Sequence, residues 1–134
     1  MLGIGEQDFS LSSDCLHNGP ILHELMHSIG FIHEHSRCDR DKFVKINISN
    51  IKIGFVKNNF SKRDCKSNEF YNLPYDYKSI MHYKGHEFSI NPYFPTIFHI
   101  NKSKSALGND HLSRIDIQKL LRAYNCPDSK ILNR

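Results

Sequence analysis

Two histidines four residues apart, His23 and His27, constrain the fold of this 134-residue chain more than any other feature. In a helix, residues at positions i and i+4 lie one turn apart on the same face. Two imidazoles placed in this way can both reach one Zn²⁺ ion at about 2.0–2.1 Å. Glu24 lies beside them and could contact a water on the metal without being a ligand. The spacing therefore predicts a helix here, with metal chemistry on one face.

The surrounding residues predict that this helix runs from about Pro20 to Ile29. Pro20 suits the first helical turn, where its missing N–H costs nothing. Gly30 can take the left-handed conformation that ends many helices. At about 100° per residue, the two histidines lie on a different face from the apolar side chains. These apolar side chains are Ile21, Leu22, Leu25, Met26 and Ile29.

A catalytic zinc site needs a third protein ligand and an open coordination position. His33 supplies that ligand if the chain reverses at Gly30, because continuing the helix would not bring it onto the face of His23. The whole string, H-E-x-x-H-x-x-G-x-x-H, resembles the extended zinc-binding pattern of the metzincins. A plainer interpretation makes His33 and His35 surface histidines that follow a helix. The position of the glycine and the spacing favour the metal site.

The remaining sequence predicts few regular elements and an α+β fold class. A strand-like alternation covers 43–48, and 96–100 is rich in β-forming residues. The long stretch between these segments is expected to be irregular. A second helix is predicted near 113–125, with Ser113 as its N-cap and Asp116 as a capping-box residue. Its apolar stripe comprises Ile117, Leu120, Leu121 and Tyr124.

Composition argues against several classes of protein. Hydrophobic residues make up 39% of the chain, which is too many for a disordered protein. The net charge is +4, but the basic residues are scattered, so no nucleic-acid partner is predicted. No apolar stretch reaches the about 20 residues that a membrane span needs. The sequence does not set the oligomeric state.

Four widely spaced cysteines favour disulfides and an oxidising, extracellular compartment. None belongs to a C-x-x-C pair, so a closed four-cysteine zinc site is not expected. Four cysteines allow three connectivities, and the spacing does not select one. Residues 1–10 lack the basic and apolar regions of a signal peptide, so we expect a chain with a truncated start. The cysteines are Cys15, Cys38, Cys65 and Cys126.

Four segments, in order along the chain, resemble the astacin family of zinc metalloendopeptidases within the metzincin clan. Residues 23–34 resemble the astacin signature, and 35–41 resemble the pattern that follows it. Residues 75–83 resemble the Met-turn, and 112–126 resemble the closing helix with its final cysteine. The similarity spans nearly all of the chain.

The resemblance implies a role for each residue of the site. His23, His27 and His33 would be ligands of a single Zn²⁺ ion, and Tyr83 would be a further, displaceable ligand. Glu24 would be the general base, and the Tyr83 hydroxyl would also stabilise the oxyanion. Without the family, a buried tyrosine hydrogen-bonded to the backbone would be the better interpretation of Tyr83.

The resemblance also implies structural roles. Gly30 would allow the turn after the helix, and Glu34 would close the signature. Met81 would pack beneath the metal, a role that differs little from ordinary core packing. Cys38 and Cys65 have no counterpart among the cysteines that the family usually pairs, and they could pair with each other.

Astacin domains normally begin well before this chain does, so we expect one partial catalytic domain over 1–134 that lacks most of its N-terminal sheet. Residues 1–33 would end the N-terminal subdomain with the active-site helix, and 34–134 would form the C-terminal subdomain. Residues 3–11 resemble the last strand before the helix. Glu34 would then lose its usual partner, the mature N-terminus. The apolar face of the helix would lose the sheet on which it packs.

The function implied is that of a secreted zinc endopeptidase acting on peptide or protein substrates. It would hydrolyse peptide bonds with a metal-activated water and a Glu general base. The alternative is a catalytically inert remnant that binds zinc or a partner. A structural zinc module would need a closed four-ligand site of Cys and His, which the spacing does not offer. Residues 108–111 lack the Arg that marks a preference for acidic substrates in some relatives, so no preference is assigned.

Overall fold

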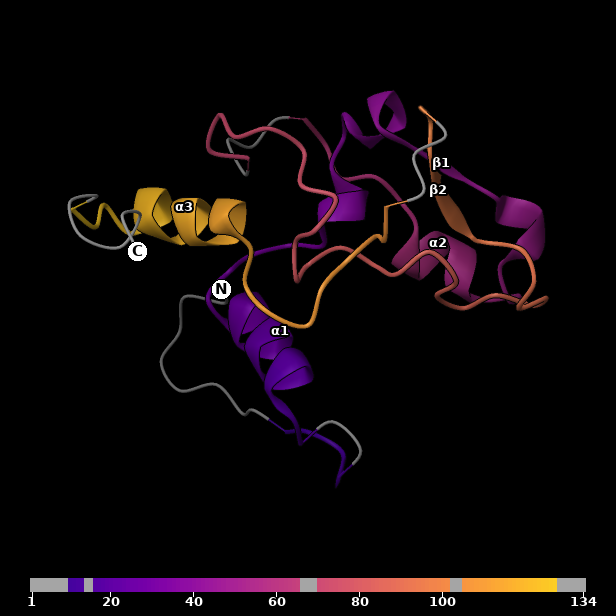
Figure 1. The fold of residues 1–134 in the computed structure, drawn as a ribbon, viewed down its shortest axis with the longest axis horizontal. Coiled ribbons are helices and arrows are strands. Elements are labelled where there is room, and N and C mark those ends of the chain that lie inside the picture. The colour runs from indigo at the N-terminus through magenta and orange to yellow at the C-terminus, as the bar shows by residue number, and fades with distance from the viewer. Residues whose placement is uncertain (1–9, 14–15, 66–69, 102–104, 128–134) are drawn as a thin grey trace.

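The computed structural model describes residues 10–13, 16–65, 70–101 and 105–127 (Figure 1). Helices and a small sheet are both present, which confirms the α+β class. None of the helices in these residues is long and apolar enough to cross a membrane. The elements are α1 (Asn18–Ser28), η2 (Glu34–Ser36), η3 (Arg40–Lys42), β1 (Val44–Ile46), η4 (Ile48–Asn50), α2 (Phe55–Asn59), β2 (Ile97–His99) and α3 (Arg114–Ala123).

Helix α1 is the predicted histidine-bearing helix. It begins at Asn18 rather than at Pro20, and it ends where predicted. Gly30 follows with φ of 99°, a conformation that residues with a side chain rarely adopt. The N–H of Phe31 donates across this turn to the carbonyl oxygen of Met26 at 3.0 Å, as in a Schellman motif. The chain therefore reverses direction directly after the helix.

Strands β1 and β2 form a two-stranded antiparallel sheet at the segments predicted to be extended. Val44 lies opposite His99, and Ile46 lies opposite Ile97. Val44 and Ile97 are almost completely buried in the larger of two apolar clusters, whose other buried members are Ile51, Phe60, Tyr75 and Leu107. The stretch between the strands is not wholly irregular, because it contains η4 and α2.

Helix α3 has the predicted N-cap. The Ser113 side chain accepts a hydrogen bond from the Asp116 N–H at 2.9 Å, and the Asp116 carboxylate accepts one from the Ser113 N–H at 3.0 Å. The same carboxylate, which is fully buried, also accepts from the Ser79 hydroxyl at 2.6 Å and from the Ile80 N–H at 2.9 Å. Asp116 thus caps α3 and ties it to the turn at 79–81.

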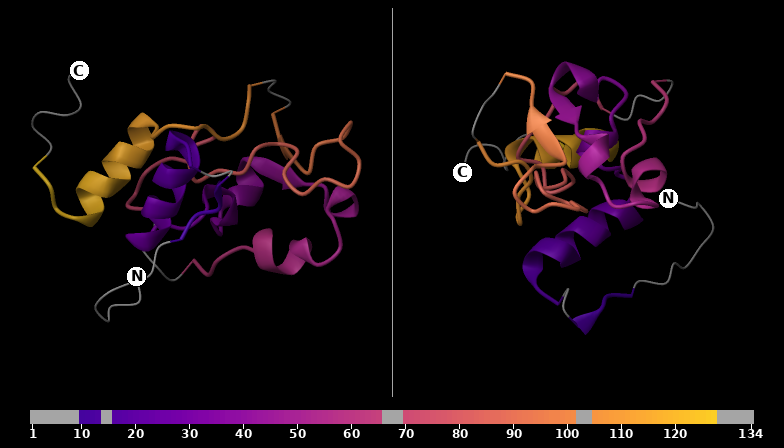
Figure 2. Two further views of the ribbon diagram at one scale, coloured as in Figure 1. Left: turned by 90° about the horizontal axis from the view of Figure 1, so that it is seen from below. Right: turned by 90° about the vertical axis from the view of Figure 1, so that its right-hand side faces the viewer.

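The second apolar cluster joins α1 to α3 and to this turn. Its buried members are Met26, Phe31, Ile80 and Met81. Partly buried side chains from the two helices and from residues beside them pack against it, among them Leu22, Ile29, Leu112, Leu120 and Ala123. The two helices lie near each other in Figure 2, and the Tyr124 hydroxyl at the end of α3 donates to the Ile29 carbonyl oxygen at 2.9 Å.

The apolar face of α1 therefore keeps more packing than the sequence predicts. Of the residues expected to lose their cover, Leu22, Met26 and Ile29 contact the second cluster, whereas Leu25 is 43% exposed. The reason is that α3, distant in sequence, supplies an apolar stripe of its own to this face.

One disulfide is present in the described residues, between Cys38 and Cys65, with their Cα atoms 5.4 Å apart. This is the pairing that the resemblance allowed. The thiol of Cys126 is free and exposed. Cys15 and most of the segment 3–11 lie outside the described residues.

We predict that Asp116→Ala lowers the free energy of unfolding by about 3–5 kcal/mol, because three donors lose a charged acceptor in a buried place. Urea titration followed by circular dichroism measures this change. Asp64→Ala, at an exposed carboxylate, is the control and should cost less than about 0.5 kcal/mol. Equal effects of the two substitutions would contradict the role of Asp116.

Candidate metal centre

Three imidazoles converge where α1 meets the loop that follows it. The Nε2 atom of His33 lies 3.1 Å from the Nε2 atom of His23 and 3.1 Å from that of His27. Donor atoms at about 2.0–2.1 Å from a tetrahedral Zn²⁺ are separated by about 3.3 Å, so the observed spacing fits such an ion. Among the described residues, these three form the only group of His, Cys, Asp or Glu side chains placed to hold a metal ion.

Backbone carbonyl groups orient two of the three rings. The Nδ1 atom of His23 lies 2.7 Å from the Ile80 carbonyl oxygen, and that of His27 lies 2.8 Å from the Phe31 carbonyl oxygen. A carbonyl oxygen only accepts, so each Nδ1 carries the hydrogen and each Nε2 directs its lone pair to the centre. Converging lone pairs repel one another unless a cation lies between them, which favours a metal ion at this place.

Burial keeps the imidazoles of His27 and His33 neutral. Burial, together with the neighbouring rings of His27 and His23, lowers the pKa of His33 to about 3. Burial also lowers the pKa of His27. Because a metal ligand must be unprotonated, these shifts suit metal binding at neutral pH.

Two hollows flank the imidazoles. One, of about 380 Å³, is lined by His23, Glu24 and Tyr83 together with Lys84 and Glu87. The exposed Glu24 side chain thus shares a hollow with the first histidine and with Tyr83. The other hollow, of about 510 Å³, is polar and lies beside His27 and His33, with Ser36, Lys62 and Arg63 on its far wall.

Tyr83 lies against the third imidazole. Its ring centroid is 4.6 Å from that of His33 and 4.0 Å from that of His35. Its hydroxyl accepts a hydrogen bond from the Asn59 side-chain amide at 3.1 Å, so the observed partner is a side chain and not the backbone. Burial raises the pKa of Tyr83, which keeps the hydroxyl protonated and able to donate a hydrogen bond.

Met81 and Glu34 link the ligand loop to the rest of the molecule. Met81 is 1% exposed, packs in the second apolar cluster, and accepts the Glu34 N–H on its carbonyl oxygen at 2.9 Å. The buried Glu34 carboxylate pairs with Lys119 of α3 and with Arg37 at 3.1 Å. It also accepts the Asp76 N–H at 2.9 Å. Glu34 was expected to lack a partner, and a lysine from the far end of the chain supplies one.

The sequence did not single out His35 as part of the site. It is completely buried, and its Nε2 atom lies 2.9 Å from the Asn59 carbonyl oxygen, so it is not the surface histidine of the plainer interpretation. Its ring and the amide of Asn59 support Tyr83 from two sides. The resemblance of 35–41 to the astacin pattern was the sequence signal for His35, and nothing in the sequence pointed to Asn59.

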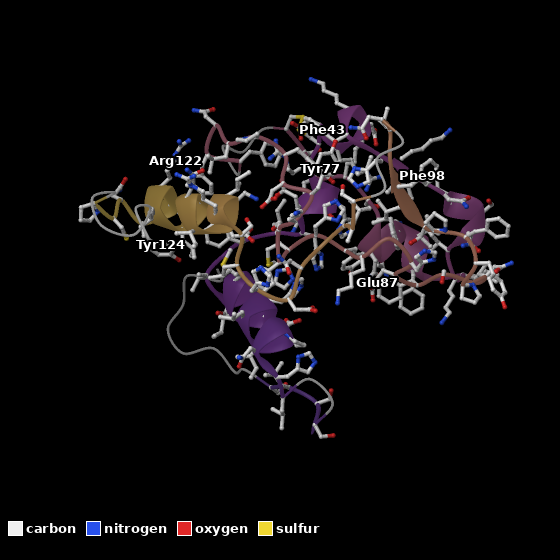
Figure 3. The ribbon with its side chains drawn as sticks, viewed as in Figure 1. Phe43, Tyr77, Glu87, Phe98, Arg122 and Tyr124 are labelled. Carbon is white, nitrogen blue, oxygen red and sulfur yellow. A yellow bond between two sulfur atoms is a disulfide. The ribbon has the colours of Figure 1, made fainter. Side chains whose placement is uncertain are left out.

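The other histidines do not join the three imidazoles. His82 is buried, and its Nε2 atom lies 2.8 Å from the Tyr75 hydroxyl, which agrees with its predicted structural place. His99 is buried beside Tyr77, which Figure 3 labels near Phe43 in the larger cluster. The remaining three, His17, His86 and His111, are exposed.

Comparison with known proteins places these residues in a family. The family model described as Astacin, a family of peptidases, matches residues 1–125. Zinc metalloproteinase nas-7 of Caenorhabditis elegans is 46% identical over 128 residues, which cover 94% of this chain and 32% of that protein. Astacin-like metalloendopeptidase of Mus musculus is 42% identical over 132 residues, covering 93% of this chain and 29% of that protein.

A solved structure resembles the fold. High choriolytic enzyme 1, a hatching enzyme zinc-protease from the medaka fish Oryzias latipes, superimposes with a TM-score of 0.75 at 43% sequence identity. The match covers 81% of this chain and 53% of that one. The chain spans about a third of the length of the curated relatives described above.

We predict that Zn²⁺ raises the thermal stability of the chain, because it binds the folded state, and the gain is about 2.7 kcal/mol at a concentration of 100 times Kd. His33→Ala should weaken zinc binding by more than about 100-fold, since even the loss of a residue that only supports a ligand weakens it 10–100-fold. Competition with a chromophoric chelator measures Kd. His111→Ala, at an exposed histidine, should leave Kd unchanged, and an equal loss there would refute the assignment.

We predict that Lys119→Met destabilises the chain by about 3–5 kcal/mol, because it leaves the Glu34 carboxylate buried with one cation fewer. The double variant Glu34→Gln/Lys119→Met should lose less free energy of unfolding than the two single variants lose together. Denaturant titrations of the parent, the two single variants and the double variant measure this difference. Lys78→Met, at an exposed lysine, controls for loss of charge. Simple additivity of the two changes would exclude the coupling.

Proposed function

The chain belongs to the astacin family of metallopeptidases, and we propose that it works as a zinc-dependent endopeptidase. The observation that carries this proposal is that the Nε2 atoms of three histidines lie close enough to one another to bind the same zinc ion. Glu24 directly follows the first of these histidines in the sequence. His23, His27 and His33 would hold the ion. When bound, zinc would lower the pKa of a water to about 7 and polarise the carbonyl group of the substrate.

Glu24 would be the general base. It is exposed in the hollow next to His23, where it can exchange protons with the attacking water and with the substrate. It would accept a proton from that water and later transfer it to the leaving amine. No covalent bond to the protein forms in this reaction, because water is the nucleophile.

Tyr83 would stabilise the oxyanion. Its hydroxyl stays protonated, lines the same hollow as Glu24, and could donate a hydrogen bond to the negative charge that develops on the carbonyl oxygen. The hydroxyl accepts a hydrogen bond from the Asn59 amide, which leaves its own proton free for this donation. Tyr83 would also be a displaceable ligand of the metal when substrate is absent.

The supporting residues would keep this geometry rigid. Gly30 would permit the reversal that returns His33 to the metal, and Met81 would pack against α1 beneath the ligands. Glu34 would anchor the loop that carries His33 through its buried ion pairs. The substrates would be peptides or proteins lying across the two hollows. The Cys38–Cys65 disulfide supports an extracellular location, because disulfides persist in oxidising compartments.

We predict that Glu24→Gln lowers kcat/KM for a quenched fluorescent peptide by about 10²–10⁴-fold, the usual contribution of a general base. Because Glu24 is not a zinc ligand, the Kd for zinc should change little. Asp64→Asn, at an exposed carboxylate outside the hollows, should cleave as well as the parent. A parent chain that binds zinc but does not cleave would instead support the inert, zinc-binding alternative.

A further inference from the structure

One end of the molecule exposes six large hydrophobic side chains, here called the apolar end. They come from η4, from α2 and the turn that leads into it, and from the loop 88–95, which lie together at the right of Figure 1. Ile53 is 97% exposed and Tyr93 is 87% exposed, whereas most exposed positions of a soluble domain carry polar residues. The other four members are Ile48, Phe55, Ile90 and Phe94.

The segments that form the apolar end are joined by hydrogen bonds. The amide of the buried Asn50 donates to the carbonyl oxygens of Asn91 and Phe94 at 3.1 and 2.6 Å, so η4 holds the loop 88–95 in place. The ring of Phe55 stacks on Phe88 with their centroids 4.5 Å apart. These segments therefore hold several large exposed apolar side chains at one end of the molecule, and an accumulation of this kind marks an interaction site.

The surface is convex at its tip. Gly54, next to Ile53, has φ of 93°, and a side-chain carbon built on it would meet no atom within 4 Å. The six side chains also line neither of the two hollows beside the imidazoles. A protruding apolar tip inserts into a fluid apolar phase more readily than it matches a complementary pocket on a folded partner.

The segments that carry the apolar end contain basic residues and no acidic ones. Residues 42–63 contain five Lys and one Arg and no acidic residue, and residues 88–101 contain no acidic residue either. Lys52 and Lys57, which belong to the segments of the apolar end, are both exposed. Glu87, labelled in Figure 3, lines the hollow at His23. A basic rim around an apolar tip complements a surface that is negatively charged outside and apolar within.

We propose that the apolar end docks on lipid bilayers that contain anionic lipids. Ile53, Tyr93 and Phe94 enter the boundary between headgroups and acyl chains, where amphipathic protein surfaces bury their apolar side chains. Lys52 and Lys57 remain at the level of the anionic headgroups and attract them. Binding of this kind is reversible, because a single apolar tip buries little surface in the bilayer. The proposal does not depend on the peptidase reaction.

Co-sedimentation of the zinc-loaded chain with vesicles tests the proposal. We expect binding to phosphatidylcholine vesicles that contain about 20% phosphatidylserine, and much weaker binding to phosphatidylcholine alone, since the lysines need an anionic surface. The variant Ile53→Ser/Tyr93→Ser/Phe94→Ser should bind the anionic vesicles at least about 10-fold more weakly, because it removes the apolar groups that insert. Lys52→Glu/Lys57→Glu should abolish the preference for phosphatidylserine.

Matched controls separate these effects from general changes in hydrophobicity and charge. Leu16→Ser changes a 65% exposed leucine outside the apolar end, and Lys78→Glu changes an exposed lysine elsewhere. Both should bind vesicles like the parent. All substituted residues of the apolar end are exposed, so each variant should keep the parent's circular dichroism spectrum and melting temperature.

Three results would overturn the proposal. The parent could fail to sediment with either kind of vesicle, or the triple serine variant could bind as well as the parent. The third is a parent that self-associates in analytical ultracentrifugation without vesicles while the triple variant is monomeric. That outcome would identify the apolar end as a contact between protein chains and not as a lipid-docking surface.

Discussion

The buried carboxylate of Glu34 is the interaction on which the geometry of the site depends. Glu34 directly follows His33, and its N–H donates to the Met81 carbonyl oxygen. Its carboxylate binds Arg37, the N–H of Asp76 and Lys119. A buried charge is tolerated only where it is paired. The loop that carries His33 can therefore take its place only when α3 and the turn at 79–81 are also in place.

A second buried carboxylate, that of Asp116, also links distant segments and acts on a metal ligand through one intervening residue. Asp116 caps α3 and accepts hydrogen bonds from the turn that contains Ile80, and the Ile80 carbonyl oxygen in turn orients the ring of His23. A chain of hydrogen bonds thus connects the start of the last helix to the first imidazole. Metal ligands are usually oriented by such outer partners, and their loss commonly weakens the site.

The site and the apolar end make different demands on the fold. At the site, hydrogen bonds and packing aim three imidazoles at one point, and burial keeps those of His27 and His33 neutral, which prepares the site for a metal ion. At the apolar end, hydrophobic side chains are held rigidly in water, which costs stability unless a partner covers them. The site accounts for the proposed peptidase chemistry. The apolar end would concentrate such a peptidase at lipid bilayers.

The sequence by itself determined the local features. Hydrogen bonds between residues a few positions apart set the end of α1 at its glycine and the capping box of α3. The helical period likewise places His23 and His27 on one face. The tertiary structure alone decided the partner of Glu34, the burial of His35, the hold of Asn59 on Tyr83 and the cover of α1 by α3. These contacts join residues 24–85 positions apart or bury side chains among distant segments. No local period relates such residues, so only the packing of the whole chain brings them together.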